Sequence, residues 1–294
     1  MPNFKAIRIR IASVKSTKQI TSAMKMVSAA KLRRAQDKIV RLRPYAYKLH
    51  EILVGLSQSL ADSEIENVYG RISVPEKILI VVVTSNRGLC GAFNSNVIRE
   101  ARRIVAEKYH EQFNKGNVSF LAIGKKGFDF LRKLNLIMLP ERNSIFNNLT
   151  FESVSVIAED VMAAFVKGNY DKVDIIYNQF KNAAVQTLTV EQFLPVETIV
   201  TKAGDPAPAD YIYEPTKEEI VKELIPKSLK IQFYKAVLDS FVAEHGARMT
   251  SMHKATDNAT QMIRELALQY NKARQAAITN QILEVVSGTE ALNG

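Results

Sequence analysis

The sequence predicts an α/β fold combined with a coiled coil: a long antiparallel coiled coil of the N- and C-terminal helices with an inserted Rossmann-like α/β domain. Apolar residues recur at alternating steps of three and four near both ends of the chain, which is the repeat of a coiled coil. In the middle, short apolar strands alternate with helices, which indicates a mainly parallel sheet covered on both faces. The expected parts are residues 1–70 for the N-terminal helix, 75–200 for the α/β domain and 210–294 for the C-terminal helix.

The N-terminal helix is predicted from two stretches of this repeat. The upstream stretch consists of Phe4, Ile7, Ile11 and Val14. The downstream stretch consists of Leu32, Ala35, Ile39, Leu42, Ala46, Leu49, Leu53, Leu56 and Leu60. Between them, the spacing of Ile20, Met24 and Val27 predicts a stutter, a slip of the heptad register in a segment poor in large apolar side chains. Pro44 predicts a kink or a local break, because proline removes a backbone donor and clashes with the preceding turn.

The strands and helices of the middle region follow from its apolar runs. Strands are expected at residues 77–84, 118–123, 136–139 and 173–178, and helices at residues 95–109, 126–134 and 151–167. Residues 183–190 alternate apolar and polar side chains, which predicts an additional antiparallel strand at the edge of the sheet. A linker rich in proline and polar residues follows before the last helical region.

The C-terminal helical region is expected to contain two helices. Thr216 and Glu219 predict a capping box for a short helix that Pro226 ends. A long helix is then predicted from about Lys227 to Val286. Its apolar seam consists of Tyr234, Leu238, Phe241, Met252, Thr256, Ala259, Ile263, Leu266, Tyr270, Ala273 and Ala277. Because each long terminal helix must bury an apolar stripe, we expect the two to pair antiparallel within the chain.

The positive charge of the chain is concentrated in its first fifty residues. The whole chain has 40 Lys and Arg against 30 Asp and Glu, a net charge of +10. Residues 1–50 contain 13 Lys and Arg and one acidic residue, Asp37, so this segment carries +12 and the rest of the chain −2. Such a segment favours nucleic acid, an anionic membrane or an acidic protein as partner. It lacks interleaved aromatic residues and a known DNA-binding motif, but a basic coiled-coil nucleic-acid-binding protein stays open as the alternative function.

Two glycine-containing turns are candidates for phosphate binding. Residues 84–94, TSNRGLCGAFN, join a predicted parallel strand to a helix, where phosphates often bind. They lack the glycine spacing of a dinucleotide site and the GK[ST] of a P-loop, so a tightly packed turn is the favoured interpretation and a nucleotide-using enzyme the minor one. Residues 124–127, GKKG, have no glycine at the P-loop distance upstream and predict a turn that opens a helix.

No catalytic, cofactor-binding or metal-binding group of residues is found in the sequence. Cys90 has no histidine near it in sequence, which favours a small buried thiol over a nucleophile. As the single cysteine it has no partner for an internal disulfide, and the four histidines lack metal-ligand spacing. The longest apolar run, residues 78–83, is far shorter than the roughly 20 residues of a membrane-spanning helix.

Three segments resemble the gamma subunits of F-type ATP synthases: IRIRIASVKSTKQITSAMKMVSAAKLRRAQ, SNRGLCGAFN and ARMTSMHKATDNATQMIRELALQYNKARQAAITNQILEVVSG. The resemblance covers the whole chain. It implies a central rotor shaft that turns inside a hexamer of alpha and beta subunits and couples ion translocation through the membrane ring of c subunits to ATP synthesis or hydrolysis. It also implies that the chain is not catalytic on its own and binds no cofactor.

The resemblance also implies which residues contact the partners. Met24 and Lys25 match the position where the first helix meets an acidic loop of the beta subunit. Arg274 and Gln275 match a pair that hydrogen-bonds a catalytic subunit, and Thr279 follows one turn later.

At the foot, Tyr211 and Glu214 match contacts with the c ring and the epsilon subunit. Gln281 and Thr289 depart from the family pattern, which commonly has glutamate and alanine there. The expected partners are therefore the alpha, beta, epsilon and c subunits and no nucleic acid, with membrane association only through the complex. The chain has neither a transit peptide nor the chloroplast insertion, so the cytoplasmic face of a bacterial inner membrane is expected.

Overall fold

The computed structural model describes residues 4–59, 68–70, 74–134, 136–196 and 217–293, and they belong to two compact units. The first unit comprises residues 1–29 and 248–294, and the second comprises residues 30–247. Helices α1 (Phe4–Ser59) and α6 (Lys217–Asn293) each contribute to both units.

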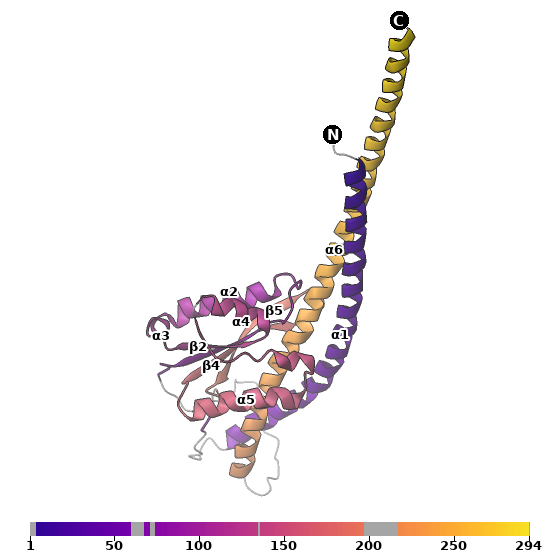
Figure 1. The fold of residues 1–294 in the computed structure, drawn as a ribbon. Coiled ribbons are helices and arrows are strands. Elements are labelled where there is room, and N and C mark those ends of the chain that lie inside the picture. Colours follow the sequence, from indigo (N-terminus) through magenta and orange to yellow (C-terminus); the bar gives the residue numbers. More distant parts are fainter. Residues whose placement is uncertain (1–3, 60–67, 71–73, 135, 197–216, 294) are drawn as a thin grey trace. The chain divides into compact units, whose positions relative to one another are not determined.

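The first unit is an antiparallel pair of helices made by the beginning of α1 and the later part of α6 (Figure 1). The ring centroids of Phe4 and Tyr270 lie 6.3 Å apart. Further along, the hydroxyl oxygens of Thr21 and Thr256 lie at 2.8 Å, within hydrogen-bond distance. The partner number falls as the α1 number rises, so the two helices run in opposite directions. This confirms the predicted antiparallel coiled coil.

The predicted stutter in α1 is wrong, because the seam keeps its register and becomes polar. Ile20 and Val27 are 57% and 58% exposed, whereas Thr21 and Ser28 are 8% and 3% exposed. One row of buried and half-buried positions in this part of α1 follows steps of four and three without a break: Ile7, Ile11, Val14, Lys18, Thr21, Lys25 and Ser28. Hydroxyl groups are tolerated there because they are paired: Ser28 Oγ donates to the carbonyl oxygen of Met24 at 2.8 Å.

In the second unit, neither helical proline ends its helix. Helix α1 continues through Pro44, and α6 begins at Lys217 and continues through Pro226, so the predicted short helix and break at residue 226 are wrong. A proline removes a single backbone hydrogen bond, and burial of the flanking side chains offsets this cost. Next to Pro226, Leu224 and Ile225 pack on a core cluster that includes Leu49 and Ile231. Thr216, the other half of the predicted capping box, lies outside the described residues.

The second unit also contains a five-stranded sheet with the strand order β3-β2-β1-β4-β5. The strands are β1 (Ile78–Val83), β2 (Val118–Ile123), β3 (Ile137–Met138), β4 (Lys172–Phe180) and β5 (Gln186–Leu194). The helices are α2 (Phe93–Lys108), α3 (His110–Asn114), α4 (Lys125–Arg132), α5 (Phe151–Val166) and the 3-10 helix η1 (Ser144–Asn147). The first four strands are parallel, and β5 pairs antiparallel with β4.

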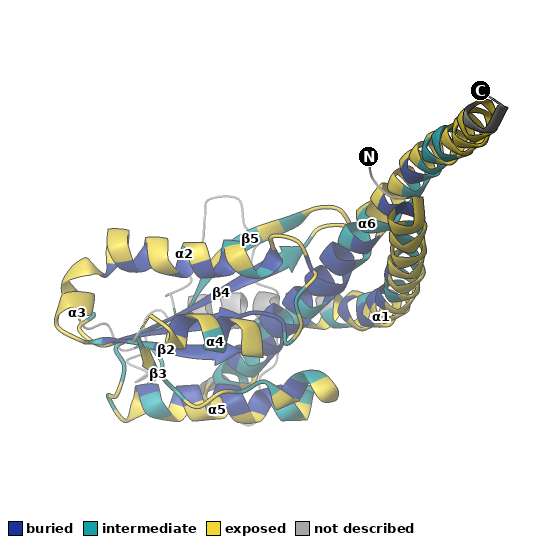
Figure 2. Cartoon of the chain, turned by 45° about the horizontal axis from the view of Figure 1, so that its top comes forward, coloured by how far each residue is buried: buried dark blue, intermediate teal, exposed yellow. Residues whose placement is uncertain are grey.

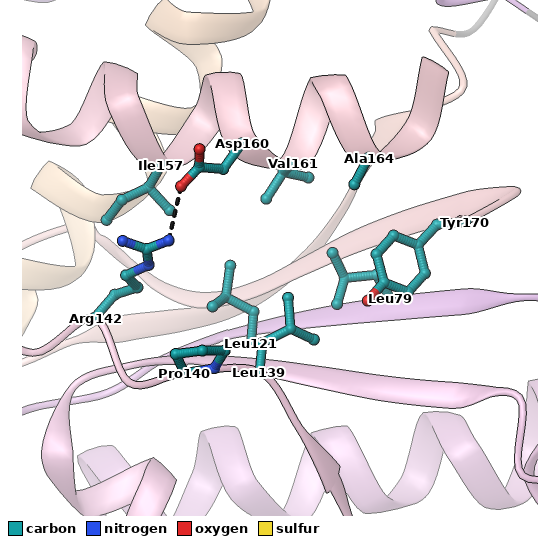
Figure 3. Close-up of a pocket in the computed structure, with 10 residues that line it drawn as sticks. All are labelled: Leu79, Leu121, Leu139, Pro140, Arg142, Ile157, Asp160, Val161, Ala164 and Tyr170. Carbon is teal, nitrogen blue, oxygen red and sulfur yellow. Dashed lines mark hydrogen bonds and ion pairs between the residues drawn. The ribbon is translucent and has the colours of Figure 1, made fainter. Parts of the chain in front are cut away.

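Both faces of the sheet are covered, as predicted for a Rossmann-like domain. All six side chains of β1 are buried. Ile80 packs in a core cluster with Val97 and Ala101 of α2. Leu79, on the opposite face of the same strand, faces Val161 and Ala164 of α5 (Figure 3). A strand buried on both faces reads as a continuous apolar run, which is why residues 78–83 could be assigned from sequence.

The edge strand β5 begins three residues later than predicted. The side-chain oxygen of Asn182 accepts hydrogen bonds from the backbone amides of Ala184 and Val185, at 3.0 and 2.8 Å. Asparagine commonly closes a turn in this way. The turn takes up the start of the predicted strand, so the predicted type and direction are confirmed and the bounds shift from 183–190 to Gln186–Leu194.

A buried hydrogen bond connects the end of α2 to β4. It predicts that the stability of the fold decreases at alkaline pH. The Tyr109 hydroxyl donates to Asp174 Oδ2 at 2.6 Å. Burial, and then the bond to Asp174, raises the pKa of Tyr109 well above its usual value. The folded chain therefore favours the neutral phenol. The stability that this gives to the fold is present below the ordinary tyrosine pKa of about 10 and is lost as the pH rises above it.

We therefore expect Tyr109→Phe to lower the free energy of unfolding at pH 7 by about 1–3 kcal/mol, since buried Asp174 loses its donor. The substitution should also reduce the fall in stability between about pH 10 and 11, because one raised tyrosine pKa is removed. Urea unfolding followed by circular dichroism at several pH values measures both effects. Tyr47→Phe, at a highly exposed tyrosine, is the control. An alkaline slope identical to that of the original chain would contradict the assignment.

Candidate partner-binding surfaces

Met24 and Lys25, the predicted contacts on α1, lie in the polar part of the seam of the first unit. Both are half-buried against the paired helix. The Lys25 Nζ lies 3.4 Å from Nδ1 of His253, and the same histidine nitrogen lies 3.4 Å from Asp257 Oδ2. This row of polar groups is exposed at its edge, so the charge of Lys25 remains available to a partner. Surface ion pairs of this kind contribute little to stability.

Arg274, Gln275 and Thr279, the predicted contacts on α6, are all exposed on the same unit. The Thr279 hydroxyl donates to the backbone carbonyl of Gln275 at 3.0 Å, so this bond does not use the Gln275 side-chain amide. Arg274 lies 21 residues beyond His253, a distance of about 30 Å along an α-helix. The two predicted sets of contacts therefore form two separate patches and not one site. Tyr211 and Glu214 lie outside the described residues.

Sequence reasoning missed an exposed apolar stripe near the end of α6. Every residue from Ile278 to Glu290 is exposed, and Figure 2 shows this end of the helix largely in the exposed colour. The large apolar side chains in it are Ile278, Ile282, Leu283, Val285 and Val286. Their spacing of four and three was readable in the sequence as a second apolar face. Such a face on an exposed helix marks a surface for another molecule.

The turn of residues 84–94 is packed and internally hydrogen-bonded. The Asn94 side chain accepts from the Ser85 amide at 2.9 Å and donates to the Ser85 hydroxyl at 2.8 Å. Cys90 is buried in the same turn. Since polar groups of the turn bond to one another, the geometry favours the predicted packed turn over a phosphate site.

The turn at Gly124 opens α4, as predicted for the GKKG segment. The amide of Lys125 donates to Asn86 Oδ1 at 3.0 Å, and the amide of Gly127 donates to the Thr84 hydroxyl at 2.9 Å. Amides at the start of a helix are the groups that bind phosphate when they are unpaired. Here both amides already donate to side chains of the protein, so neither is available to a phosphate.

A small cavity of about 50 Å³ lies between α5 and the sheet (Figure 3). Its walls are mostly apolar, and Arg142 pairs with Asp160 at 2.7 Å at one end. Pockets for small molecules and cofactors usually measure roughly 300–1,000 Å³. This cavity is far too small for a nucleotide. Among the described residues, no group of three or more His, Cys, Asp or Glu is arranged to hold a metal ion.

Comparisons with known proteins agree with one another over the length of the chain. The family model described as ATP synthase matches residues 3–292. The ATP synthase gamma chain of Flavobacterium johnsoniae is 57% identical over 295 residues and covers 100% of both chains. The ATP synthase gamma chains of Cytophaga hutchinsonii and Geobacter metallireducens are 52% and 46% identical, again with 100% coverage of both chains.

Solved structures show the same likeness in three dimensions. A chain from the central stalk and c-ring of Tetrahymena thermophila mitochondrial ATP synthase has 26% sequence identity and a TM-score of 0.58, over 80% of this chain and 99% of that one. A chain from the rotor of Euglena gracilis mitochondrial ATP synthase has 22% identity and a TM-score of 0.65, over 94% and 98% of the two chains. The second likeness shows the fold alone. Among the described residues, none of the helices contains an apolar stretch that could span a lipid bilayer.

Proposed function

Because the chain belongs to the ATP synthase gamma chain family, we propose that it is the central rotor shaft of an F-type ATP synthase. It mechanically couples ion translocation through a membrane ring to ATP synthesis or hydrolysis in a hexamer of alpha and beta subunits. The observation that carries this proposal is the identity of 57% to a gamma chain over the whole of both chains. The antiparallel coiled coil and the Rossmann-like sheet support it independently.

The proposal assigns no catalysis to the chain itself. Its partners are the alpha and beta subunits of the hexamer, the epsilon subunit and the c-subunit ring, and no nucleic acid. The structural relatives named as central stalk, c-ring and rotor support these partners. The bacterial relatives support a location on the cytoplasmic face of the inner membrane, where the chain is peripheral and held only by the complex.

The surface of the first unit suits a shaft that turns against several identical neighbours. A deep complementary contact with one beta subunit would hold the rotor in a single orientation. The exposed basic groups of α1, among them Arg8, Arg10 and Lys15, provide instead a long-range attraction to an acidic surface that depends weakly on orientation. Met24 and Lys25 belong to this surface. The apolar stripe at the end of α6 supplies a second contact, for which we propose an apolar surface of the hexamer, here called the apolar collar.

The foot of the rotor is proposed from sequence alone. Tyr211 and Glu214 are retained as contacts with the c ring and the epsilon subunit. We also propose residues 1–70, 75–200 and 210–294 as the functional parts: the first shaft helix, the α/β domain, and a last part that contains Tyr211, Glu214 and the second shaft helix.

The proposal is tested by purifying the tagged chain from its native membranes and identifying the bound proteins by mass spectrometry. We expect alpha, beta, epsilon and c subunits to stay bound in moderate salt. Recovery of the chain with nucleic acid and without alpha and beta subunits would reject the rotor and favour the nucleic-acid alternative.

Arg274 provides a residue-level test of the same proposal. In complexes reconstituted into vesicles, we expect Arg274→Ala to lower ATP synthesis by about tenfold, since hydrogen bonds to charged groups contribute about 1.5–3 kcal/mol. Assembly should be unchanged, because Arg274 is exposed in the free chain. Lys272→Ala, at another exposed basic residue of α6, is the matched control. Equal rates in the two variants would remove Arg274 from the contact surface.

A further inference from the structure

The place where parallel α/β domains usually bind ligands is filled in this chain by its own helix. Such sites lie at the carboxyl ends of the strands where the strand order reverses, here between β1 and β4. Cys90 and Phe93, which follow β1, form a buried cluster with Ala243 and Ala247 of α6. Phe180, at the end of β4, packs on the same cluster. The crevice is therefore a docking site for α6.

Helix α6 is buried on nearly all sides in this region, which is unusual for half of a two-helix coiled coil. Eleven of the twelve residues from Ala236 to Ala247 are buried, and the twelfth, Phe241, is half-buried. In Figure 2 this part of α6 is drawn largely in the buried colour. Just before it, the side-chain amide of Gln232 donates to Glu191 of β5 at 2.7 Å. A helix enclosed in this way cannot slide or roll without losing packing on several faces.

Gly246 lets the turn after β4 approach the helix closely. A Cβ atom at this position would lie 3.2 Å from the carbonyl oxygen and 3.3 Å from the Cα of Ala183. Glycine inside a helix is destabilising relative to alanine. The close backbone contact gives the physical reason for a glycine at this point.

Asn94 fixes the other side of the contact. Its side chain bonds the amide and the hydroxyl of Ser85 and donates to Cys90 Sγ at 3.4 Å. Asn178 of β4 donates to the backbone carbonyl of Phe93 at 3.1 Å. These bonds hold Cys90 and Phe93 in the position in which they meet α6.

We propose that this contact is a fixed joint, with Asn94 and Gly246 as its positioning residues, through which the α/β domain and α6 turn as one body. The joint is defined by the cluster of Cys90, Phe93, Phe180, Ala243 and Ala247. This inference rests on the proposed rotor function and adds where torque passes between the domain and the shaft helix.

The first test is Asn94→Ala in the complete complex in vesicles. The buried Ser85 amide loses its acceptor, so the population with an opened joint should rise by about tenfold. We expect the number of ions pumped per ATP hydrolysed to fall several-fold while the complex still assembles. Ser95→Ala, an exposed neighbour on α2, is the matched control. An unchanged pumping ratio in Asn94→Ala would overturn the proposal.

The second test uses the native cysteine as a reversible staple. With Ala247→Cys, oxygen and copper phenanthroline oxidise the two thiols at positions 90 and 247 to one disulfide with loss of two protons and two electrons, and dithiothreitol reduces it again. We expect the staple to leave turnover unchanged when Asn94 is intact, and to restore the pumping ratio in the Asn94→Ala variant. Slower turnover of the stapled chain with Asn94 intact, or failure of the two thiols to join, would overturn the joint.

The two proposals fail in different ways in this experiment. If complexes lacking the chain pump ions as well as complete ones, the rotor function itself is rejected, whatever the variants do. If the chain is required and the staple inhibits turnover, the rotor function stands and the domain must move relative to α6.

Discussion

Gly124→Ala is expected to destabilise the α/β domain by at least about 3 kcal/mol, because backbone strain and overpacking act at the same residue. Gly124 has a φ of +112°, a conformation that residues with a side chain rarely adopt. A Cβ atom there would lie 2.2 Å from the carbonyl oxygen of Thr84 and 2.8 Å from its hydroxyl. Thr84 cannot withdraw easily, since its amide donates to the Ile123 carbonyl at 2.8 Å.

Urea unfolding of the purified chain, followed by circular dichroism, measures this effect. Gly116→Ala is the matched control, since Gly116 has a φ of +74° but nothing within 4 Å of an added Cβ. It should cost only about 1 kcal/mol of backbone strain. Equal losses of stability in the two variants would show that the contact with Thr84 does not determine the need for glycine.

Much of the fold could be predicted because apolar runs report burial directly. Strand β2 was predicted with the bounds that the structure gives, since its residues are almost all buried. The start of β5 was misplaced because the side-chain bonds of Asn182 close a turn that hydrophobicity does not reveal. The helix end predicted at Pro226 was wrong for a related reason. The low helix propensity of proline predicted an end, but the packing of Leu224 and Ile225 outweighs that propensity.

The seam of α1 shows that following the large apolar residues alone can give the wrong register. Counting heptad steps from Ile7 reaches Thr21 and Ser28 without a slip. Following the large apolar residues leads instead to Ile20 and Val27, which are exposed. In a coiled coil the backbone period decides which positions face the partner helix, and small hydroxyl side chains are tolerated there once they are hydrogen-bonded.

The candidate contact residues could be predicted only by resemblance. Arg274 and Gln275 are exposed on a helix, and nothing in their local chemistry identifies a partner. The groups that they are proposed to bind belong to other subunits, and the sequence of this chain does not describe those groups. The apolar stripe was different, since the positions of Ile278, Ile282 and Val285 could have been read as a partner surface.

Ile282→Asp is expected to lower ATP synthesis by the reconstituted complex at least tenfold while leaving the free chain folded. Ile282 is 58% exposed, so its replacement removes little packing and costs only about 0.5 kcal/mol of helix propensity in the free chain. In the proposed complex the same position faces an apolar collar. Burying an unpaired carboxylate there costs several kcal/mol, which exceeds the 1.4 kcal/mol that corresponds to a tenfold change.

Asn280→Asp is the matched control, because it adds the same side chain two residues away, on the face of the helix opposite Ile282. Circular dichroism of the free chains and synthesis rates of the complexes separate the two explanations. A large loss in Ile282→Asp alone means that the apolar face is buried during turnover. Equal losses in both variants would mean that added negative charge near the end of α6, and not desolvation of the stripe, slows the rotor, and the apolar collar would then have to be abandoned as a partner.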